Sequence, residues 1–192
     1  MSHPEPVERD NEAERPVIEA IQCGDAYAMS EFVRRHDRWV RGVVFGVLGR
    51  RADLEDVAQQ VWMKVWREAR QLEDTGRWRP WLYRIARNAA FDAGRSIKRR
   101  QSAMDHLAAR TGRTAPTAPS AADRLRAEEQ LVAMLGAIEA LPAIYREPFV
   151  LKHLEGWSYK DIGELLDLPT DTVETRLVRA RRLLRESLAG RL

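Results

Sequence analysis

The sequence predicts an all-α protein made of two small helical domains. Apolar residues recur at helical spacing through most of the chain, and no segment shows the alternation of a strand. A segment rich in Ala, Thr, Pro and Ser interrupts this pattern. We therefore expect a disordered lead-in over 1–15, a helical domain over 16–100, a flexible linker over 101–122 and a second helical domain over 123–192.

The composition excludes several classes of protein. The chain has 192 residues, 44% of them hydrophobic, which is enough for a core, and its net charge of +3 says little about partners. The single cysteine, Cys23, excludes an internal disulfide, and its helical apolar context favours a core position over a redox sensor. The four histidines are scattered, so no metal site is expected. No apolar run approaches the roughly 18 residues of a transmembrane helix, and we expect a cytoplasmic protein without membrane insertion.

The helix expected from Asp53 carries the strongest pattern in the first domain. A second strip on this helix is mostly polar, and it is either plain surface or a docking face for a partner helix. The apolar stripe consists of Leu54, Val57, Ala58, Val61, Trp62 and Val65, and the polar strip of Asp56, Gln59, Gln60, Met63 and Arg67.

A basic stripe follows this helix. Eight basic residues and one acidic residue lie between Arg77 and Arg100, a local excess that favours phosphate backbones. The stripe begins in a predicted loop over 71–79 and continues on a helix that starts near Pro80. Its interleaved basic and aromatic residues suit single-stranded DNA, although the aromatic residues could instead anchor the core. We expect Trp81 to be core and leave both readings open for Trp78.

The second domain contains a helix-turn-helix pattern over 158–185. Ser158 and Asp161 form a variant of the capping box at the start of the first helix. Asp167 can adopt the left-handed conformation that ends this helix, and Pro169 prevents its continuation. Thr170 is positioned to cap the second helix. The second helix divides into two faces, of which one is apolar and the other suits a major groove or plain solvent. The apolar face holds Val173, Leu177, Ala180, Leu184 and Leu188, and the opposite face holds Thr175, Val178, Arg179 and Arg182.

Five motifs occur in a specific order along the chain. They are LEDVAQQVW at 54–62, WLYRIARN at 81–88, LP at 141–142, WSYKDI at 157–162 and TVETRLVRAR at 172–181. Together they resemble the extracytoplasmic-function (ECF) group of bacterial sigma-70 factors, and the resemblance covers most of 16–188. Each motif is weak alone, but two motif-bearing domains in this order form a specific signal.

The resemblance implies an RNA polymerase sigma factor that brings core polymerase to a promoter and helps to melt the DNA. Region 2 would dock on the clamp of the largest subunit and hold the unpaired −10 strand, with a flipped base in a pocket of the 71–79 loop. Region 4 would read the −35 element and reach the flap of the second-largest subunit. The implied polymerase-binding residues are Asp56, Gln59, Gln60 and Met63; the −10 residues are Arg77, Trp78, Arg79, Arg84, Arg87 and Asn88; the −35 residues are Thr172, Thr175, Arg176, Val178, Arg179 and Arg182.

The chain departs from the family pattern at three places. Gln60 stands where the family usually has Glu, and Asp171 and Glu174 put negative charge near the start of the recognition helix. This charge suits the helix dipole but repels nearby phosphate, and Glu174 could accept from a cytosine amino group. We expect a −35 preference different from that of members with Lys at this place.

No hydrolytic motif or cofactor site is visible, so the chain is not expected to be an enzyme. The group implies an anti-sigma factor as a further partner. Two other hypotheses remain. A one-piece helix-turn-helix regulator would bind duplex DNA without polymerase but would leave the motifs of the first domain without a role. A structural or adaptor protein would carry its basic strips as solvated faces only.

Overall fold

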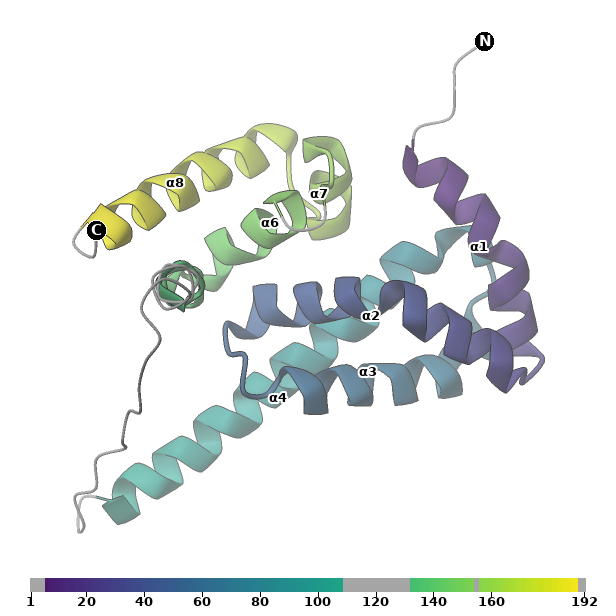
Figure 1. Cartoon of the computed structure of the whole chain (residues 1–192), viewed down its shortest axis with the longest axis horizontal. Helices are drawn as coiled ribbons and strands as arrows, with labels where there is room; N and C mark the ends of the chain where they lie inside the picture. The colour runs from purple at the N-terminus through teal and green to yellow at the C-terminus, as the bar shows by residue number, and fades with distance from the viewer. Residues whose placement is uncertain (1–5, 109–131, 154–155, 190–192) are drawn as a thin grey trace, which may run out of the picture.

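Helices make up all the regular structure in residues 6–108, 132–153 and 156–189, the parts of the chain that the computed structural model describes (Figure 1). The all-α class is therefore confirmed. A helix over 132–140 precedes α6. The labelled elements are α1 (Pro6–Gln22), α2 (Ala26–Leu48), α3 (Leu54–Glu68), α4 (Trp78–Ala108), α6 (Ala143–His153), α7 (Tyr159–Leu166) and α8 (Thr170–Ala189), with short 3-10 turns η1 (Ala69–Gln71) and η2 (Thr75–Arg77).

The first half of the molecule is built on α2, α3 and α4, which contact one another, while α1 packs against α2 and the two 3-10 turns. Asp25 caps α2 by accepting from the backbone N–H groups of Tyr27 and Ala28. Gly49 ends α2 in the left-handed conformation, with φ of 65°. The stripe predicted for α3 faces the core: Val57, Ala58, Val61, Trp62 and Val65 are all buried, and Leu54 packs against them in part.

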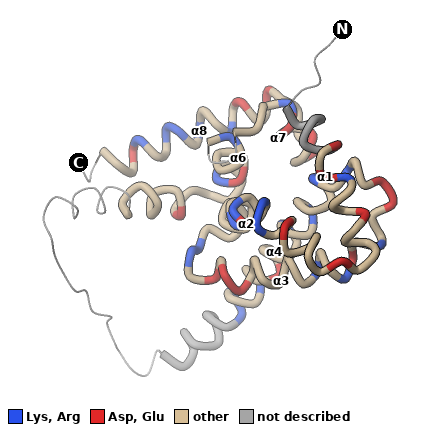
Figure 2. The backbone as a smooth tube through the Cα atoms, turned by 45° about the vertical axis from the view of Figure 1, so that its right-hand side comes forward, with Lys and Arg blue, Asp and Glu red and all other residues tan. Residues whose placement is uncertain are grey.

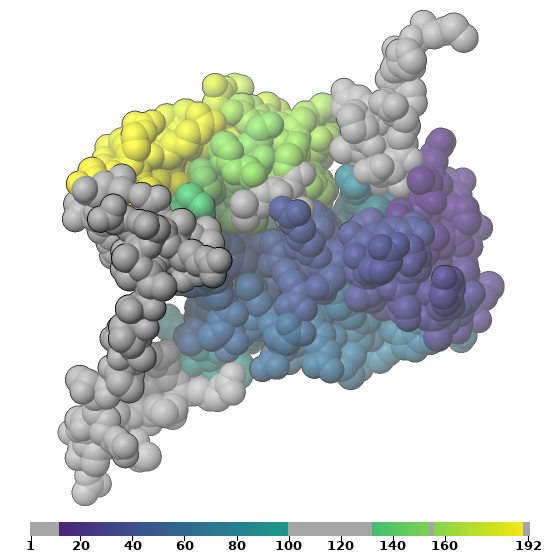
Figure 3. Space-filling view, viewed as in Figure 1, coloured from purple at the N-terminus to yellow at the C-terminus, as the bar shows by residue number. Residues whose placement is uncertain are grey.

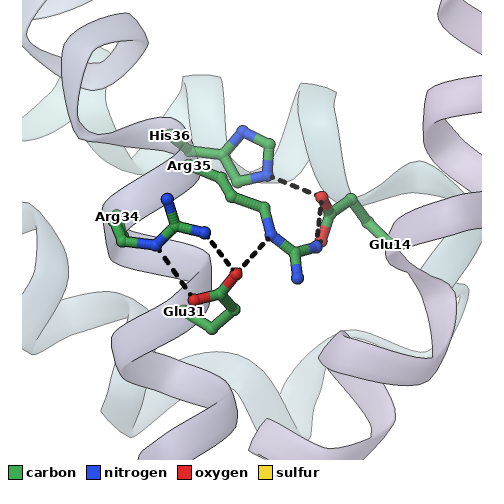
Figure 4. Close-up of polar contacts among 5 residues, drawn as sticks. All are labelled: Glu14, Glu31, Arg34, Arg35 and His36. Carbon is green, nitrogen blue, oxygen red and sulfur yellow. Dashed lines mark hydrogen bonds and ion pairs between the residues drawn. The ribbon is translucent and has the colours of Figure 1, made fainter.

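The lead-in contains a helix, so the expectation of disorder is wrong for 6–15, while residues 1–5 lie outside the described part. Helix α1 starts at Pro6, a residue suited to a first turn. Its Glu14 is buried, with the carboxylate 3.0 Å from Nη1 of Arg35 and 3.2 Å from Nε2 of His36 on α2 (Figure 4). The polar start of α1 is thus anchored to α2 by the Glu14–Arg35 ion pair, while Ile18 and Ile21 anchor the rest of the helix in the core.

A second set of ion pairs lies beside this one on α2. Arg34 and Arg35 both donate to the carboxylate of Glu31 (Figure 4). The hydrogen bond from Arg34, together with the nearby positive charges, lowers the pKa of Glu31 to about 2.

Cys23 is exposed, so the expectation of a core position is wrong. Helix α1 ends at Gln22, and Cys23 lies in the turn before α2. Because the helix ends one residue before Cys23, the apolar periodicity of α1 does not place this side chain in the core.

The helix-turn-helix forms as predicted. Ser158 and Asp161 make a reciprocal capping box at the start of α7, and Asp167 ends that helix with φ of 55°. Helix α8 begins at Thr170 itself, after the break at Pro169. The predicted inward residues of α8 are buried or half-buried: Val173, Leu177, Ala180, Leu184 and Leu188.

The two halves share one hydrophobic core. Helix α6 packs against α2, and α7 and α8 pack against α6, so that both halves form one continuous surface (Figures 1 and 3). Trp39 of α2 stacks on Trp157, which precedes α7, with ring centroids 6.0 Å apart and planes 10° apart. Helix α4 continues to Ala108, past the predicted start of the linker at 101, which corrects that boundary. The rest of that linker and the predicted helix start at Asp123 lie outside the described residues.

Candidate nucleic-acid and partner interfaces

A pocket of about 470 Å³ opens between the end of α3, the 71–77 turns and the start of α4. This volume lies in the usual range for small-molecule sites. Cationic, acidic and amide side chains meet there over an apolar floor. The lining residues are Lys64, Glu68, Gln71, Leu72, Arg77, Pro80, Trp81, Arg84, Ile85 and Asn88.

The structure brings together three residues that the resemblance assigned to the −10 strand: Arg77, Arg84 and Asn88 line this pocket, and all three are exposed. Trp81 is buried as expected, and it also forms part of the pocket wall. Sequence reasoning missed Lys64. It lies one residue after Met63 of the predicted polar strip of α3, and only the packing of α3 against α4 brings it to the pocket.

Arg87 lies on the same helix but in a different environment. Its guanidinium is 4.7 Å from the ring centroid of the exposed Phe91, and its Nε donates to Glu147 of α6 over 2.8 Å. The hydroxyl of Tyr83 donates to the same carboxylate. Burial acts to lower the pKa of Arg87, but the charge of Glu147 more than offsets this, so the pKa lies above its ordinary value. Burial, and next the charge of Glu147, raise the pKa of Tyr83.

Trp78 is core rather than surface, with 1% of its area exposed. It packs against Phe32, His36 and Trp39 of α2, so in this structure it is not available to a DNA strand, which corrects its inclusion among the −10 residues. Arg79 is half-buried, with its guanidinium 5.3 Å from the ring centroid of Trp78 and 5.6 Å from that of Trp157. The aromatic residue at the start of α4, Trp78, is thus part of the core, whereas Phe91 further along the helix lies at the surface.

Helix α8 presents an open face. Thr175, Val178, Arg179 and Arg182 are exposed, and Thr172 and Arg176 are half-exposed. Basic residues recur along this helix (Figure 2). The hydroxyl of Thr175 donates to the carbonyl of Asp171 over 2.8 Å, which leaves its methyl group and a lone pair of Oγ1 for other contacts. A depression of about 390 Å³ lies between this face and α6, lined by Ile144, Tyr145, Asp171, Thr172, Thr175, Arg176 and Arg179.

The polar strip of α3 is also at the surface. Asp56, Gln59 and Gln60 are exposed, and Met63 is 57% exposed. Trp66 lies three residues after Met63 and is 41% exposed, so it adds an apolar side chain to the strip. Sequence reasoning missed Trp66, although its helical spacing from Gln59 and Met63 was a usable signal.

Within the described part of the chain, no group of three or more His, Cys, Asp or Glu side chains is placed to hold a metal ion. The helices there are also too short or too polar to cross a membrane.

Comparisons with known proteins identify the family. Residues 32–101 match Sigma-70 region 2, and residues 131–184 match Sigma-70 region 4. The chain is 33% identical over 174 residues to the RNA polymerase sigma factor CarQ of Myxococcus xanthus, covering 89% of this chain and 95% of the relative. It is 29% identical over 177 residues to the ECF sigma factor SigW of Bacillus subtilis, covering 89% and 94%.

Two solved structures have a similar fold. CnrH in complex with the cytosolic domain of CnrY has a TM-score of 0.65 at 23% identity, covering 93% of this chain and 98% of that chain. The sigma factor RpoE in complex with the anti-sigma factor NepR from Bartonella quintana has a TM-score of 0.61 at 23% identity, covering 83% and 96%. Sigma factors as a family are non-catalytic factors of transcription initiation. Both sigma regions occur in order, and the matches to SigW and CarQ cover most of each protein. This chain therefore belongs to the ECF group of the sigma-70 family of RNA polymerase sigma factors.

Proposed function

We propose that this sigma factor holds the unpaired −10 strand at the start of α4, reads the −35 element with α8 and docks on core polymerase through α3. The observation that carries the proposal is the pocket that joins Arg77, Arg84 and Asn88. A base that leaves the stack needs a pocket with hydrogen-bonding groups for its edge and cations for its backbone. Glu68, Gln71 and Asn88 supply the polar edges, and Arg77 and Arg84 supply the charge.

The role of α8 follows from its two faces. The buried face anchors the helix, while Val178 and Arg179 project outward, where arginine suits guanine edges and valine suits a thymine methyl. Asp171 and Glu174 are exposed near the start of the helix. Their charge disfavours phosphate at that place, so we expect the −35 preference to differ from that of relatives with a basic residue there.

The partners in this proposal are core RNA polymerase, promoter DNA and an anti-sigma factor, and the work takes place in the cytoplasm. Asp56, Gln59, Gln60 and Met63 form the docking face for the clamp of the largest subunit, with Trp66 as an added apolar contact. Region 4 contacts the flap of the second-largest subunit. The similar structures of CnrH and RpoE were solved with CnrY and the anti-sigma factor NepR, which supports a partner of this kind here.

The test is run-off transcription with purified core polymerase and promoter fragments from the genome that encodes this chain. We expect defined start sites that weaken at least about tenfold with Arg84→Ala and with Arg179→Ala, as charged contacts to nucleic acid require. Arg34→Ala, which removes an exposed arginine outside both faces, is the matched control and should leave initiation unchanged. Defined initiation that survives both binding-face substitutions would overturn the assignment of these faces.

A further inference from the structure

The two halves meet at an interface that contains a buried arginine. Arg146 of α6 is 6% exposed. Its guanidinium donates to the carbonyls of Gly46 and Val47 in α2 over 3.0 and 2.9 Å, and to those of Glu139 and Leu141 in its own half over 2.8 and 2.6 Å. The last carbonyls of a helix lack partners within it and carry the negative end of its dipole. The second half of the chain therefore completes the end of α2.

The next residue, Glu147, directs its carboxylate to α4. It is 8% exposed and accepts hydrogen bonds from Arg87 and Tyr83, both in the first half. An added Cβ on Gly46 would lie 3.4 Å from the Cα of Glu147, which shows how closely the two backbones approach. A carboxylate on a guanidinium offers the same charge-assisted hydrogen bond as a DNA phosphate. Glu147 thus occupies Arg87, a cation that the resemblance assigns to the −10 strand and that lies on the same helix as Arg84 and Asn88.

This closed arrangement does not fit a promoter. The −35 and −10 elements lie about 25 base pairs apart, or roughly 85 Å at about 3.4 Å per base pair. A compact chain of 192 residues has a radius of gyration of about 16 Å and is about 40 Å across. Helices α4 and α8 in one compact body therefore cannot reach both elements together, and the halves must separate before both are bound.

We propose that Glu147 is an internal latch that holds Arg87 in place of DNA, so that the chain by itself keeps this part of its −10 face closed until the two halves separate. The latch rests on the proposed role of the α4 face in strand capture. It differs from control by a separate inhibitor because both sides of the contact come from this chain. Arg146 stabilises the closed state, and on opening water can hydrate both this arginine and the carbonyls of α2.

The first test replaces the latch charge while keeping its shape. Glu147→Gln should raise the affinity of the full chain for a fluorescent random-sequence 12-nucleotide single-stranded DNA about tenfold, as expected for loss of a buried charged contact. It should also increase the radius of gyration measured by small-angle scattering. The matched control is Glu139→Gln, since Glu139 also crosses between the halves, to Arg51, but touches no proposed DNA residue. Unchanged affinity and size in Glu147→Gln would overturn the latch.

The second test locks the closed state. An added Cβ on Gly46 lies 3.6 Å from the Cβ of Val150, within the range for a disulfide. A Gly46→Cys/Val150→Cys chain, with Cys23→Ser to remove the native thiol, should initiate transcription at least about tenfold more weakly when oxidised, and reduction should restore it. The reduced form controls for misfolding.

The two proposals fail in different ways. If Arg84→Ala leaves single-strand binding unchanged in the reduced chain, the proposed −10 face is wrong. If Arg84→Ala weakens binding but the oxidised, locked chain initiates as well as the reduced one, the latch alone is wrong.

Discussion

Helices α4 and α8 have the same kind of pattern, with arginines on one face and apolar residues on the other, but their arginines differ in how accessible they are. On α8, Val178 is 56% exposed and the side chain of Arg179 is also exposed to solvent. On α4, Arg87 is held by a carboxylate from the other half of the chain. The difference shows that a basic helical face is not in itself an available binding surface, because a residue remote in sequence can cover it.

The comparison also separates two tasks of the factor. The face proposed for duplex reading is exposed in the closed state, whereas the face proposed for strand capture is in part covered. Strand capture should therefore depend on separation of the halves, and duplex reading should not.

The largest effect is expected from Leu177→Ala in α8. Leu177 is fully buried in the core that both halves share, so its loss should lower the free energy of unfolding by about 2–5 kcal/mol. Urea unfolding followed by tryptophan fluorescence should show one transition at a lower midpoint. The exposed neighbour substitution Val178→Ala should change stability by less than about 0.5 kcal/mol. Two separate transitions, with the first half unchanged, would mean that the halves fold independently.

Gly49→Ala should weaken the interface between the two halves, because it strains the backbone at the end of α2 and displaces Arg146. Gly49 has φ of 65°, and an added Cβ would lie 2.2 Å from Cζ of Arg146. A left-handed alanine and a displaced arginine should together cost about 1–3 kcal/mol in the free energy of unfolding, measured by denaturant titration. Gly136→Ala is the control of opposite sign, because its Cβ meets no atom within 4 Å in a helical segment and should stabilise by about 0.5–1 kcal/mol. Equal effects of the two changes would contradict this account.

The two faces should differ in how their arginines contribute to binding. Arg179→Ala should cost the holoenzyme about 1–3 kcal/mol on its best −35 duplex and relax preference at one position. Arg84→Ala should weaken single-strand binding without sequence preference and reduce the slope of log affinity against log salt by about 0.7. Binding titrations at several salt concentrations measure both. A sequence-specific loss with Arg84→Ala would show that this residue reads a base.

The smallest effect is expected from pH. Burial lowers the pKa of His36 below its ordinary 6.5, against the opposing effect of Glu14, while Arg79 and Arg35 lower it further. The folded state therefore binds the proton less well than the unfolded state. The stability that neutral His36 contributes is complete above about pH 6.5 and is lost as the pH falls from there toward the lowered pKa. Thermal unfolding at several pH values should show this loss, and His36→Gln should reduce it.

Much of the fold was predictable because it depends on local signals. The stripe of α3 was evident from spacing, and the capping box at Ser158, the left-handed Asp167 and the break at Pro169 were evident from residue type. Two of the expectations that failed depended on distant partners or on a helix end. Helix α1 is held by Glu14 against α2, and Cys23 lies just past the end of its helix.

The candidate sites divide in the same way. Arg84 and Asn88 were expected from the resemblance, and the pocket brings them together. The contribution of Lys64 and Glu68 to that pocket needed the packing of α3 against α4, since neither residue carries a motif of its own. Trp78 had the same basic neighbours as a stacking residue, and only its packing against α2 placed it in the core.

The sequence alone determined most of the helices, their apolar faces, the helix-turn-helix and the family, because periodicity, caps and motif order depend on residues close in sequence. Only the tertiary structure decided that the two halves share a core, that Arg146 completes the end of α2, and that Glu147 pairs with Arg87 from 60 residues away. The physical reason is that a buried ion pair forms only where two particular surfaces pack together. The sequence pattern of one helix does not indicate which other helix packs against it.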